Sequence, residues 1–174
     1  MDWFANIEYL ITGNPRQQNA YKVLKALKIL ERLSQYNPVL SGTIPIEIDI
    51  PSSDLDIICQ CEDHQEFSLN ISSLYGDKKG FQKQTDYYDG IESTVVKFQE
   101  ESFKIEIFAQ NKPVLQQNAY KHMIIEYKIL KTKGLAFRDK IIALKKEGYK
   151  TEPAFAKLLG LKGDPYKALL KVEI

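Results

Sequence analysis

Two aspartates separated by one leucine, Asp54 and Asp56, stand at the start of the apolar run Ile57-Ile58-Cys59. On a β-strand, residues two apart point to the same face, so the two carboxylates would lie side by side. Neighbouring carboxylates repel each other and raise each other's proton affinity unless a cation lies between them. Carboxylate oxygens suit a hard divalent cation such as Mg²⁺ or Mn²⁺. The alternative is a turn capped by Ser52-Ser53-Asp54, which explains one acid better than two.

A third acid, Glu106, lies alone in the alternating apolar stretch 103–108. An unpaired charge on a half-buried strand is costly, so Glu106 needs a partner. If its strand neighbours that of Asp54 and Asp56, three carboxylates converge and can hold one or two Mg²⁺ ions. Such ions would orient a nucleotide triphosphate and neutralise charge on the attacking and leaving oxygens. A salt bridge to a lysine across the sheet is the alternative.

A small turn, Gly42-Thr43, is separated by ten residues from Asp54-Leu55-Asp56-Ile57. Together with the later strand Ile105-Glu106-Ile107, this spacing resembles the signature of the nucleotidyltransferase superfamily typified by DNA polymerase beta. That resemblance covers residues 39–109. A second resemblance, to an uncharacterised bacterial family catalogued only as a domain of unknown function, spans nearly the whole chain. It is carried by GTIPIEIDIPSSDLDIIC at 42–59, EIFAQ at 106–110, PVLQQNAYKHMIIE at 113–126, TEPAFAKLLGL at 151–161 and GDPY at 163–166.

The resemblance implies an α+β fold, with a small mixed sheet of the nucleotidyltransferase type packed by helices. It implies that Gly42, Thr43 and Ser53 approach the nucleotide phosphates. Asp54, Asp56 and Glu106 would be the catalytic, metal-binding carboxylates. The implied activity is Mg²⁺-dependent transfer of a nucleoside monophosphate from a nucleotide triphosphate to an acceptor that the sequence does not identify. The alternative is a non-catalytic nucleotide-binding or interaction module on the same fold.

The segment after Gly42 departs from the superfamily pattern, which usually has a serine followed by a short helix. Here Thr43 is followed by isoleucines at 44, 46, 48 and 50, in alternation with Pro45, Glu47 and Asp49. A period of two predicts extended chain with one buried face. Because prolines cannot donate to a ladder, we expect an edge or irregular segment here that reshapes the phosphate site.

Three further residues are accessory candidates. Arg16 has the forked guanidinium that grips phosphates, although a solvated arginine is the plainer interpretation. His122, beside Lys121 near the start of a predicted helix, is placed to contact a phosphate or to take a proton from an acceptor hydroxyl. The alternative is a histidine packed beside Met123 and Tyr127.

The elements that must position these residues follow from hydrophobic periodicity and from glycine and proline punctuation. A core with N-terminal helices is expected over residues 1–111, and a helical region packed on it over 112–174, as a single compact unit. The predicted helices cover 2–11, 15–34, 64–75 and most of the chain from 116 onward, with ends at Gly134, Gly148 and Gly160 and starts at Thr151 and Asp164. The predicted strands cover 39–40, 54–61, 81–88, 93–99 and 103–108, with a hairpin between the last two.

The hexapeptide Gln-Gln-Asn-Ala-Tyr-Lys occurs twice, at 17–22 and at 116–121. The sequences between the copies do not match, so no duplicated domain is inferred. Both copies are expected to be helix N-termini that meet similar structural demands. Anion binding by their exposed amides is the alternative.

The net charge of +1 hides a strong segregation. Residues 44–111 hold five basic and fourteen acidic residues, whereas residues 112–174 hold fourteen basic and six acidic ones. An acidic centre beside a basic C-terminal third suits a metal site that faces a phosphate-binding wall. The alternative is that the lysines solubilise helices and lie near their C-termini.

The composition also limits the partners. The lysines of the last third form no dense tract with interleaved aromatics, so nucleic-acid binding is not supported. No apolar run is long enough to span a bilayer, and Met1-Asp2-Trp3 lacks the positive start of a secretory signal. We therefore expect a cytoplasmic protein whose partners are a nucleotide triphosphate and an unidentified acceptor. The sequence does not set the oligomeric state.

Overall fold

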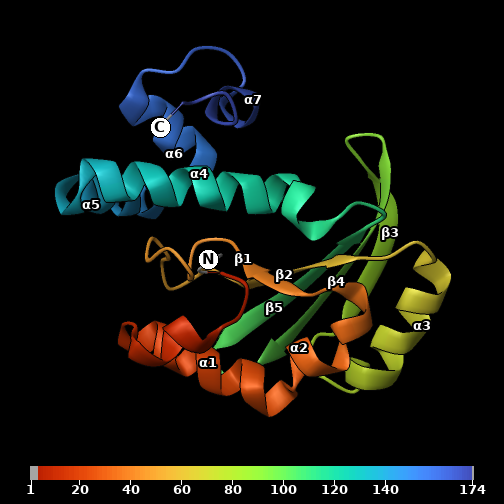
Figure 1. Ribbon diagram of the computed structural model, residues 1–174. Coiled ribbons are helices and arrows are strands. Elements are labelled where there is room, and N and C mark those ends of the chain that lie inside the picture. Colours follow the sequence, from red (N-terminus) through yellow and green to blue (C-terminus); the bar gives the residue numbers. More distant parts are fainter. Residues whose placement is uncertain (1–3, 174) are drawn as a thin grey trace.

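The computed structural model describes residues 4–173 and is organised around one mixed β-sheet (Figure 1). The strand order is β1-β2-β5-β4-β3, in which β2 and β5 are parallel and the other neighbours antiparallel. With helices on both faces of the sheet, the α+β prediction is confirmed. The strands are β1 (Val39–Ser41), β2 (Leu55–Gln60), β3 (Gln82–Tyr88), β4 (Ile91–Glu100) and β5 (Phe103–Gln110).

The strands appear where the sequence alternates. In β5, Ile105, Ile107 and Ala109 are buried on one face, and Glu106 and Phe108 face the opposite way. The predicted hairpin joins β4 to β5. Edge strand β3 is exposed along its whole length, and its lysine and aspartate discourage pairing with another chain.

Three helices cover one face of the sheet: α1 (Pro15–Leu27), α2 (Ile29–Arg32) and α3 (His64–Tyr75). The helix predicted at 64–75 is confirmed. The single helix predicted over 15–34 is wrong, because Lys28 adopts a left-handed conformation with φ 51° and ends α1. A capping box at Asn14, formed with Gln17, fixes the start of α1.

The helix predicted over 2–11 is also largely wrong. Residues 1–3 lie outside the described residues, and a short 3₁₀ helix, η1 (Glu8–Thr12), is the only helix in residues 4–13. The side chain of Asn6 accepts a hydrogen bond from the Glu8 backbone amide. Such a local bond offers the backbone an alternative to the α-helix.

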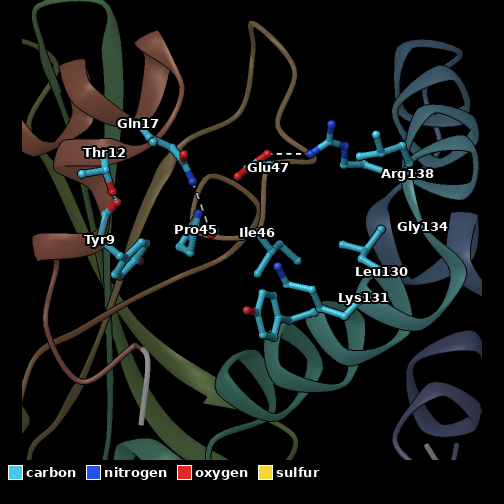
Figure 2. Close-up of a pocket in the computed structure, with 13 residues that line it drawn as sticks. Tyr9, Thr12, Gln17, Pro45, Ile46, Glu47, Leu130, Lys131, Gly134 and Arg138 are labelled. Carbon is cyan, nitrogen blue, oxygen red and sulfur yellow. Dashed lines mark hydrogen bonds and ion pairs between the residues drawn. The ribbon is translucent and has the colours of Figure 1, made fainter. Parts of the chain in front are cut away.

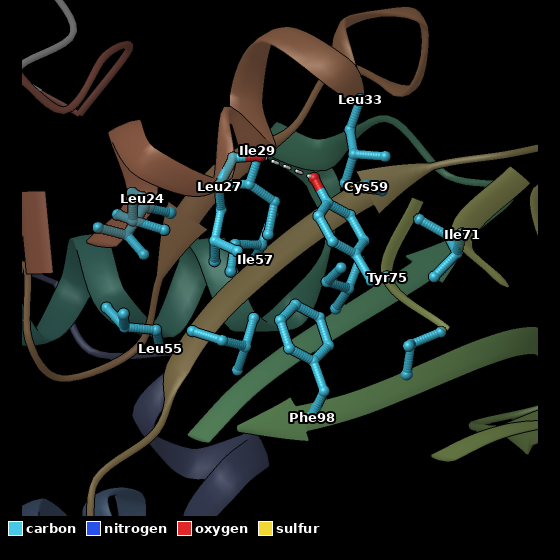
Figure 3. Close-up of a cluster of buried hydrophobic side chains, with 14 of the residues drawn as sticks. Leu24, Leu27, Ile29, Leu33, Leu55, Ile57, Cys59, Ile71, Tyr75 and Phe98 are labelled. Carbon is cyan, nitrogen blue, oxygen red and sulfur yellow. Dashed lines mark hydrogen bonds between the residues drawn. The ribbon is translucent and has the colours of Figure 1, made fainter. Parts of the chain in front are cut away.

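Between these helices and the sheet lies the first hydrophobic core (Figure 3). Tyr75 from α3 stacks on Phe98 from β4 with ring centroids 5.2 Å apart. Its hydroxyl donates to the Leu27 carbonyl oxygen over 3.4 Å, which ties α3 to the end of α1. The Tyr75 ring is therefore buried while its hydroxyl group keeps a hydrogen bond.

Four helices lie over the opposite face of the sheet: α4 (Asn118–Lys133), α5 (Leu135–Lys146), α6 (Thr151–Leu159) and α7 (Pro165–Leu169). They follow a short 3₁₀ helix, η3 (Val114–Gln116). The predicted starts at Thr151 and Asp164 are confirmed, as are the predicted ends at Gly134 and Gly160. None of the helices within residues 4–173 has the length and apolarity to cross a membrane.

A second hydrophobic core lies under these four helices. Ile46, Ile48 and Ile58 from the sheet side pack in one cluster with α4, α5 and α6, which contribute residues such as Met123 and Phe155. The division into a core at 1–111 and a helical region at 112–174 stays a prediction.

Both copies of the repeated hexapeptide start a helix, but they meet different demands. Gln17, the first glutamine of its copy, is buried and donates to the Ile44 carbonyl oxygen over 3.0 Å. Gln117, the second glutamine of its copy, is buried and donates to the carbonyl oxygens of Cys59 (2.8 Å) and Lys112 (3.0 Å). The side chains therefore satisfy backbone carbonyls instead of gripping an external anion.

Replacing Gln117 with alanine is expected to lower the free energy of unfolding by about 2 kcal/mol, because two enclosed carbonyl oxygens lose their donor. Urea denaturation measures this loss. The matched control is Gln116→Ala, since Gln116 is adjacent and exposed, and it should change stability by less than about 0.5 kcal/mol. Equal effects of the two variants would contradict the assignment.

Candidate active site

The parallel pair β2 and β5 brings the predicted carboxylates to one face of the sheet. Asp56 lies directly opposite Glu106 in the register, and Asp54 stands just ahead of β2. The sheet face that carries them is opposite the first hydrophobic core, where Leu55 and Ile57 are buried. The predicted strand neighbourhood is therefore confirmed.

The carboxylate of Asp56 is largely enclosed, and its electrostatic environment is unfavourable. Its pKa is raised to about 7, mainly by burial and in smaller part by the nearby carboxylates of Glu106 and Asp54. The pKa of Asp54 is also raised, mainly by burial, while the nearby Lys104 opposes the shift. A carboxyl group with such a pKa lacks sufficient positive charge around it, as expected of a site designed for a cation.

Gly42 permits this position of Asp56. Its φ of 81° lies in the left-handed region, and a Cβ added to it would overlap Asp56 Oδ2 and stand 3.1 Å from Asp56 Cγ. No L-residue with a side chain fits there without moving the carboxylate. The glycine of the Gly42-Thr43 turn therefore lets a metal-binding candidate lie against the backbone.

Glu106 makes the ion pair that was the alternative interpretation. Lys97 on neighbouring strand β4 lies opposite it, with Nζ 2.8 Å from Glu106 Oε2. In residues 4–173, no three His, Cys, Asp or Glu side chains are arranged so that they could hold a metal ion. For Asp54, Asp56 and Glu106 to share an ion, Glu106 must release Lys97. Because the Lys97 side chain is 57% exposed, that pair is worth only about 1 kcal/mol or less.

The segment after Gly42 is not extended, which corrects the prediction for residues 44–50. The amide of Ile48 donates to the Thr43 carbonyl oxygen, and the amide of Glu47 to that of Ile44. With Glu47 left-handed at φ 61°, these bonds form the Schellman arrangement that ends a helical turn. The isoleucines alternate for another reason: Ile44 enters the first core, and Ile46 and Ile48 enter the second.

This turn is held from two sides, beside a separate cavity of about 390 Å³ (Figure 2). Gln17 of α1 binds the Ile44 and Pro45 carbonyl oxygens, and Arg138 of α5 forms an ion pair with Glu47. The cavity shares no lining residue with the two cavities that reach Asp56. Gln17 and Arg138, which make the two contacts that hold residues 44–47, both line this cavity.

Arg16 holds the loop that precedes Asp54. Its Nε lies 3.0 Å from Asp49 Oδ2, and its Nη2 donates to the carbonyl oxygens of Pro51 and Ser53. The guanidinium also lies over the Phe103 ring, 4.6 Å from its centroid. These contacts occupy the guanidinium, and a role for Arg16 in phosphate binding stays a prediction.

Thr43 and Ser53 lie together beside the carboxylates. The Thr43 hydroxyl is 3.3 Å from Ser53 Oγ, which accepts a hydrogen bond from the Ile50 amide. Both side chains are only half-buried. The turn and the Asp54 loop are thus joined at the position predicted to meet phosphates.

Two cavities meet at this site, and their charges differ. The first, called here the acidic cavity, has a volume of about 410 Å³ and is lined by Asp56, Asp89, Glu106, Glu126 and Glu152 among others. The second, the lysine cavity, has a volume of about 580 Å³ and is lined by Lys145, Lys146 and Lys150 together with Asp54 and Ser53. Four residues line both cavities: Thr43, Asp56, Glu106 and Thr151.

The burial of Lys145 was not predicted from the sequence, where it looked like one of the solvated lysines near a helix end. Its Nζ donates to the Ile48 carbonyl oxygen over 2.8 Å, and burial lowers its pKa to about 8 against the opposing pull of Glu126, Asp49 and Asp56. Helical spacing could have predicted this burial, since Ile141, Leu144 and Lys145 share one buried face of α5.

Of the two accessory candidates on α4, His122 and Lys121, only one lies at the candidate site. His122 is buried and lines the acidic cavity; its Nε2 donates to the Tyr166 carbonyl oxygen over 2.9 Å, and its Nδ1 lies 3.5 Å from Glu152 Oε1. Lys121 is exposed and lines a different hollow, with Leu115 and Leu170. The structure thus brings His122, but not Lys121, to the cavity that contains Asp56.

In metal-free protein, Asp56→Asn is expected to remove part of the pH dependence of stability. A pKa raised from 3.8 to about 7 means that the folded state holds the proton more tightly. The free energy of unfolding therefore falls as pH rises from about 4 to about 7. Asparagine does not titrate, so at pH 7.5 the variant should be more stable by as much as about 4 kcal/mol.

Urea denaturation in EDTA at several pH values measures this difference, with Asp139→Asn, an exposed change on α5, as the control. A turn-capping role for Asp56 predicts the opposite result, a destabilised variant at every pH.

Sequence comparison places residues 22–172 in the family described as "Domain of unknown function (DUF4269)". The chain belongs to this family. The match includes all three candidate carboxylates and the four helices over the site. No curated protein matches the sequence.

Solved structures show which fold this member of the family has. The Cid1 poly(U) polymerase with MgGTP bound aligns with a TM-score of 0.54 at 14% identity, over 74% of this chain and 41% of the polymerase. The same enzyme with Mg 3'-dATP bound aligns at 0.54 and 13%, over 90% and 48%. The GLD-2/RNP-8 complex aligns at 0.53 and 13%, over 82% and 56%. The fold is that of the nucleotidyltransferases, and the chain spans about half the length of these proteins.

Proposed function

We propose that this protein is a Mg²⁺-dependent nucleotidyltransferase, which transfers a nucleoside monophosphate from a nucleotide triphosphate to an acceptor hydroxyl. The observation that carries the proposal is the pairing of Asp56 with Glu106 across parallel strands, with Asp56 lying against Gly42. A structural cap would not need two facing carboxylates and a glycine that makes room for one of them.

The triphosphate is assigned to the junction of the two cavities. Gly42, Thr43 and Ser53 lie beside the carboxylates, and Thr43 and Ser53 offer hydroxyl groups to phosphate oxygens. The lysine cavity supplies positive charge from Lys145 and its neighbours, which suits the β- and γ-phosphates. Positioning and electrostatics account for most of the catalysis in phosphoryl transfer.

Asp54, Asp56 and Glu106 would hold Mg²⁺ or Mn²⁺. The fit is chemical, because all three donors are carboxylate oxygens. Burial and neighbouring carboxylates raise the pKa values of Asp54 and Asp56, and a bound hard cation would lower them again. When bound, the ion supplies charge neutralisation to the reacting phosphate oxygens.

The proposed nucleotidyl transfer is a substitution at phosphorus and involves no change of oxidation state. The oxygen of the acceptor hydroxyl forms a bond to the α-phosphorus, and the bond from that phosphorus to the bridging β-phosphate oxygen breaks. Pyrophosphate leaves with the bonding electron pair. We assign the hydroxyl proton to Glu106, since it lines both cavities and its ion pair with Lys97 is largely exposed.

A second candidate is a non-catalytic nucleotide-binding module on the same fold. The observation that favours it is the ion pair between Glu106 and Lys97, which directs the third carboxylate away from Asp54 and Asp56. Such a module would bind nucleotide and release no pyrophosphate.

Titration calorimetry with Mg²⁺ and non-hydrolysable analogues of the four ribonucleotide triphosphates tests the proposal. The wild type is expected to bind at least one analogue, and EDTA should abolish binding. The double variant Asp54→Asn/Asp56→Asn should lose binding with its fold intact, and Asp139→Asn should keep it. Unchanged binding by the double variant would refute the site assignment.

A further inference from the structure

The acidic cavity has a charge distribution that the triphosphate does not explain. Its lining includes five carboxylates and no lysine or arginine. A triphosphate is anionic and fits the lysine cavity on the other side of Asp56. Even with Asp56 and Glu106 assigned to metal, Asp89 and Glu152 keep this cavity negative, and Glu126 adds to this charge when it is ionised.

Glu126 is the feature that points to a ligand. It projects from α4, is 3% exposed and lines the acidic cavity. Its Oε1 is fully enclosed and has no hydrogen-bond partner among residues 4–173. Leaving a buried carboxylate oxygen without a donor is among the costlier arrangements in a folded protein. A bound molecule that brings a donor group to Glu126 would lower this cost.

The surroundings of Glu126 add negative charge. Its pKa is raised to about 8, mainly by burial and in smaller part by the carboxylate of Glu152 on α6. Lys145, which lines the lysine cavity and donates to Ile48, opposes this shift and forms no ion pair with Glu126. A positively charged group in the acidic cavity would be attracted by Glu152, and its charge would favour the ionised form of Glu126.

Several other polar groups of this cavity wall already have partners, although Gln117 Oε1 is also buried without one in the part of the chain that the structure describes. His122 donates to the Tyr166 carbonyl oxygen and has Glu152 beside its second ring nitrogen. Asp89 accepts from the side chain of Asn118 over 3.3 Å. Glu126 and Glu152 are thus the carboxylates left to receive a donor in the part of the cavity formed by α4 and α6.

We propose that the acceptor substrate is a small molecule that carries a protonated amine, which Glu126 and Glu152 bind in the acidic cavity while its hydroxyl faces Asp56 and Glu106. The identification of this molecule as the acceptor rests on the proposed function, whereas the amine-binding site does not depend on it. An ammonium group fits because it supplies up to three donors and one positive charge. A cavity of about 410 Å³ is in the range used by small ligands.

Binding of 1,3-diamino-2-propanol, measured by NMR titration without nucleotide or metal, tests the proposal. Glycerol is the matched uncharged probe, because it has the same three-carbon skeleton with hydroxyls in place of amines. The wild type should bind the diamine saturably, and glycerol at least about tenfold more weakly. Glu126→Gln should weaken diamine binding by at least about tenfold, and Glu152→Gln by a smaller factor.

Asp54→Asn separates this proposal from the proposed function, since Asp54 lines only the lysine cavity. It should keep diamine binding and lose Mg-nucleotide binding. Diamine binding without any nucleotide binding would leave the amine site standing and refute the transferase. Equal binding of glycerol and diamine, or undiminished diamine binding by Glu126→Gln with a native melting temperature, would overturn the amine site. So would a Glu126→Gln variant that loses only nucleotide binding.

Discussion

Replacing Asp56 with asparagine is expected to slow pyrophosphate release from Mg-nucleotide by about three orders of magnitude or more. The change keeps the shape of the side chain and removes the charge that lies opposite Glu106 and against Gly42. A loss of about 4 kcal/mol of transition-state stabilisation corresponds to that factor. A coupled pyrophosphate assay with each nucleotide, at saturating Mg²⁺ and with 1,3-diamino-2-propanol as the acceptor, measures it.

Asp56→Asn should be inactive and, above pH 7, more stable than the wild type. This combination, lost activity with raised stability, is typical of a residue that lowers the stability of the fold but is needed for catalysis. Asp139→Asn, also a carboxylate-to-amide change, should retain both activity and stability. An Asp56→Asn variant that releases pyrophosphate at the wild-type rate would exclude Asp56 from the reaction.

Gly42→Ala is expected to abolish Mg-nucleotide binding and pyrophosphate release. The added methyl group would overlap the Asp56 carboxylate, and its left-handed backbone would add about 1–2 kcal/mol of strain. Calorimetry and the pyrophosphate assay measure the functional loss, and urea denaturation measures the strain.

Gly160→Ala is the matched control. Gly160 also has a left-handed φ, 68°, but a Cβ there would meet nothing within 4 Å. Both variants should lose stability from backbone strain, Gly42→Ala should lose more because its methyl group overlaps Asp56, and only Gly42→Ala should lose nucleotide binding. If both bind nucleotide like the wild type, the close approach of Gly42 to Asp56 has no functional meaning.

The part of the site that could be predicted from the sequence is the part set by local pattern. A single acid in an apolar alternation located Glu106 on a strand, and the Asp-Leu-Asp spacing located two carboxylates on one face. Their juxtaposition depends on the parallel pairing of β2 with β5, which no local pattern predicts and which the structure shows.

The prediction of extended chain for residues 44–50 is wrong because an alternating pattern of apolar residues can have two physical origins. A strand buries every second residue on one face, whereas here a tight turn delivers successive isoleucines to two different cores. The left-handed Glu47 gives no sequence signal, since glycine is the usual residue at that position. With the turn present, the chain is closer to the superfamily pattern of a short helix after the glycine.

The acidic cavity could not be predicted from the sequence for a different reason. Glu126 and Lys145 lie on helices whose charged residues read as solvated, and their burial depends on how α4, α5 and α6 pack over the sheet. Tertiary packing of this kind leaves little trace in periodicity when a charged residue occupies a core-facing position.

The most direct test of the account is a crystal structure with Mn²⁺ and a non-hydrolysable nucleotide triphosphate, in which anomalous scattering locates the metal. We expect Mn²⁺ bound by oxygens of Asp54, Asp56 and Glu106, with Glu106 released from Lys97. The phosphates should lie between the Gly42-Thr43 turn and the lysine cavity. Metal or nucleotide bound elsewhere, such as in the cavity beside Arg138, with Glu106 still paired to Lys97, would contradict the account.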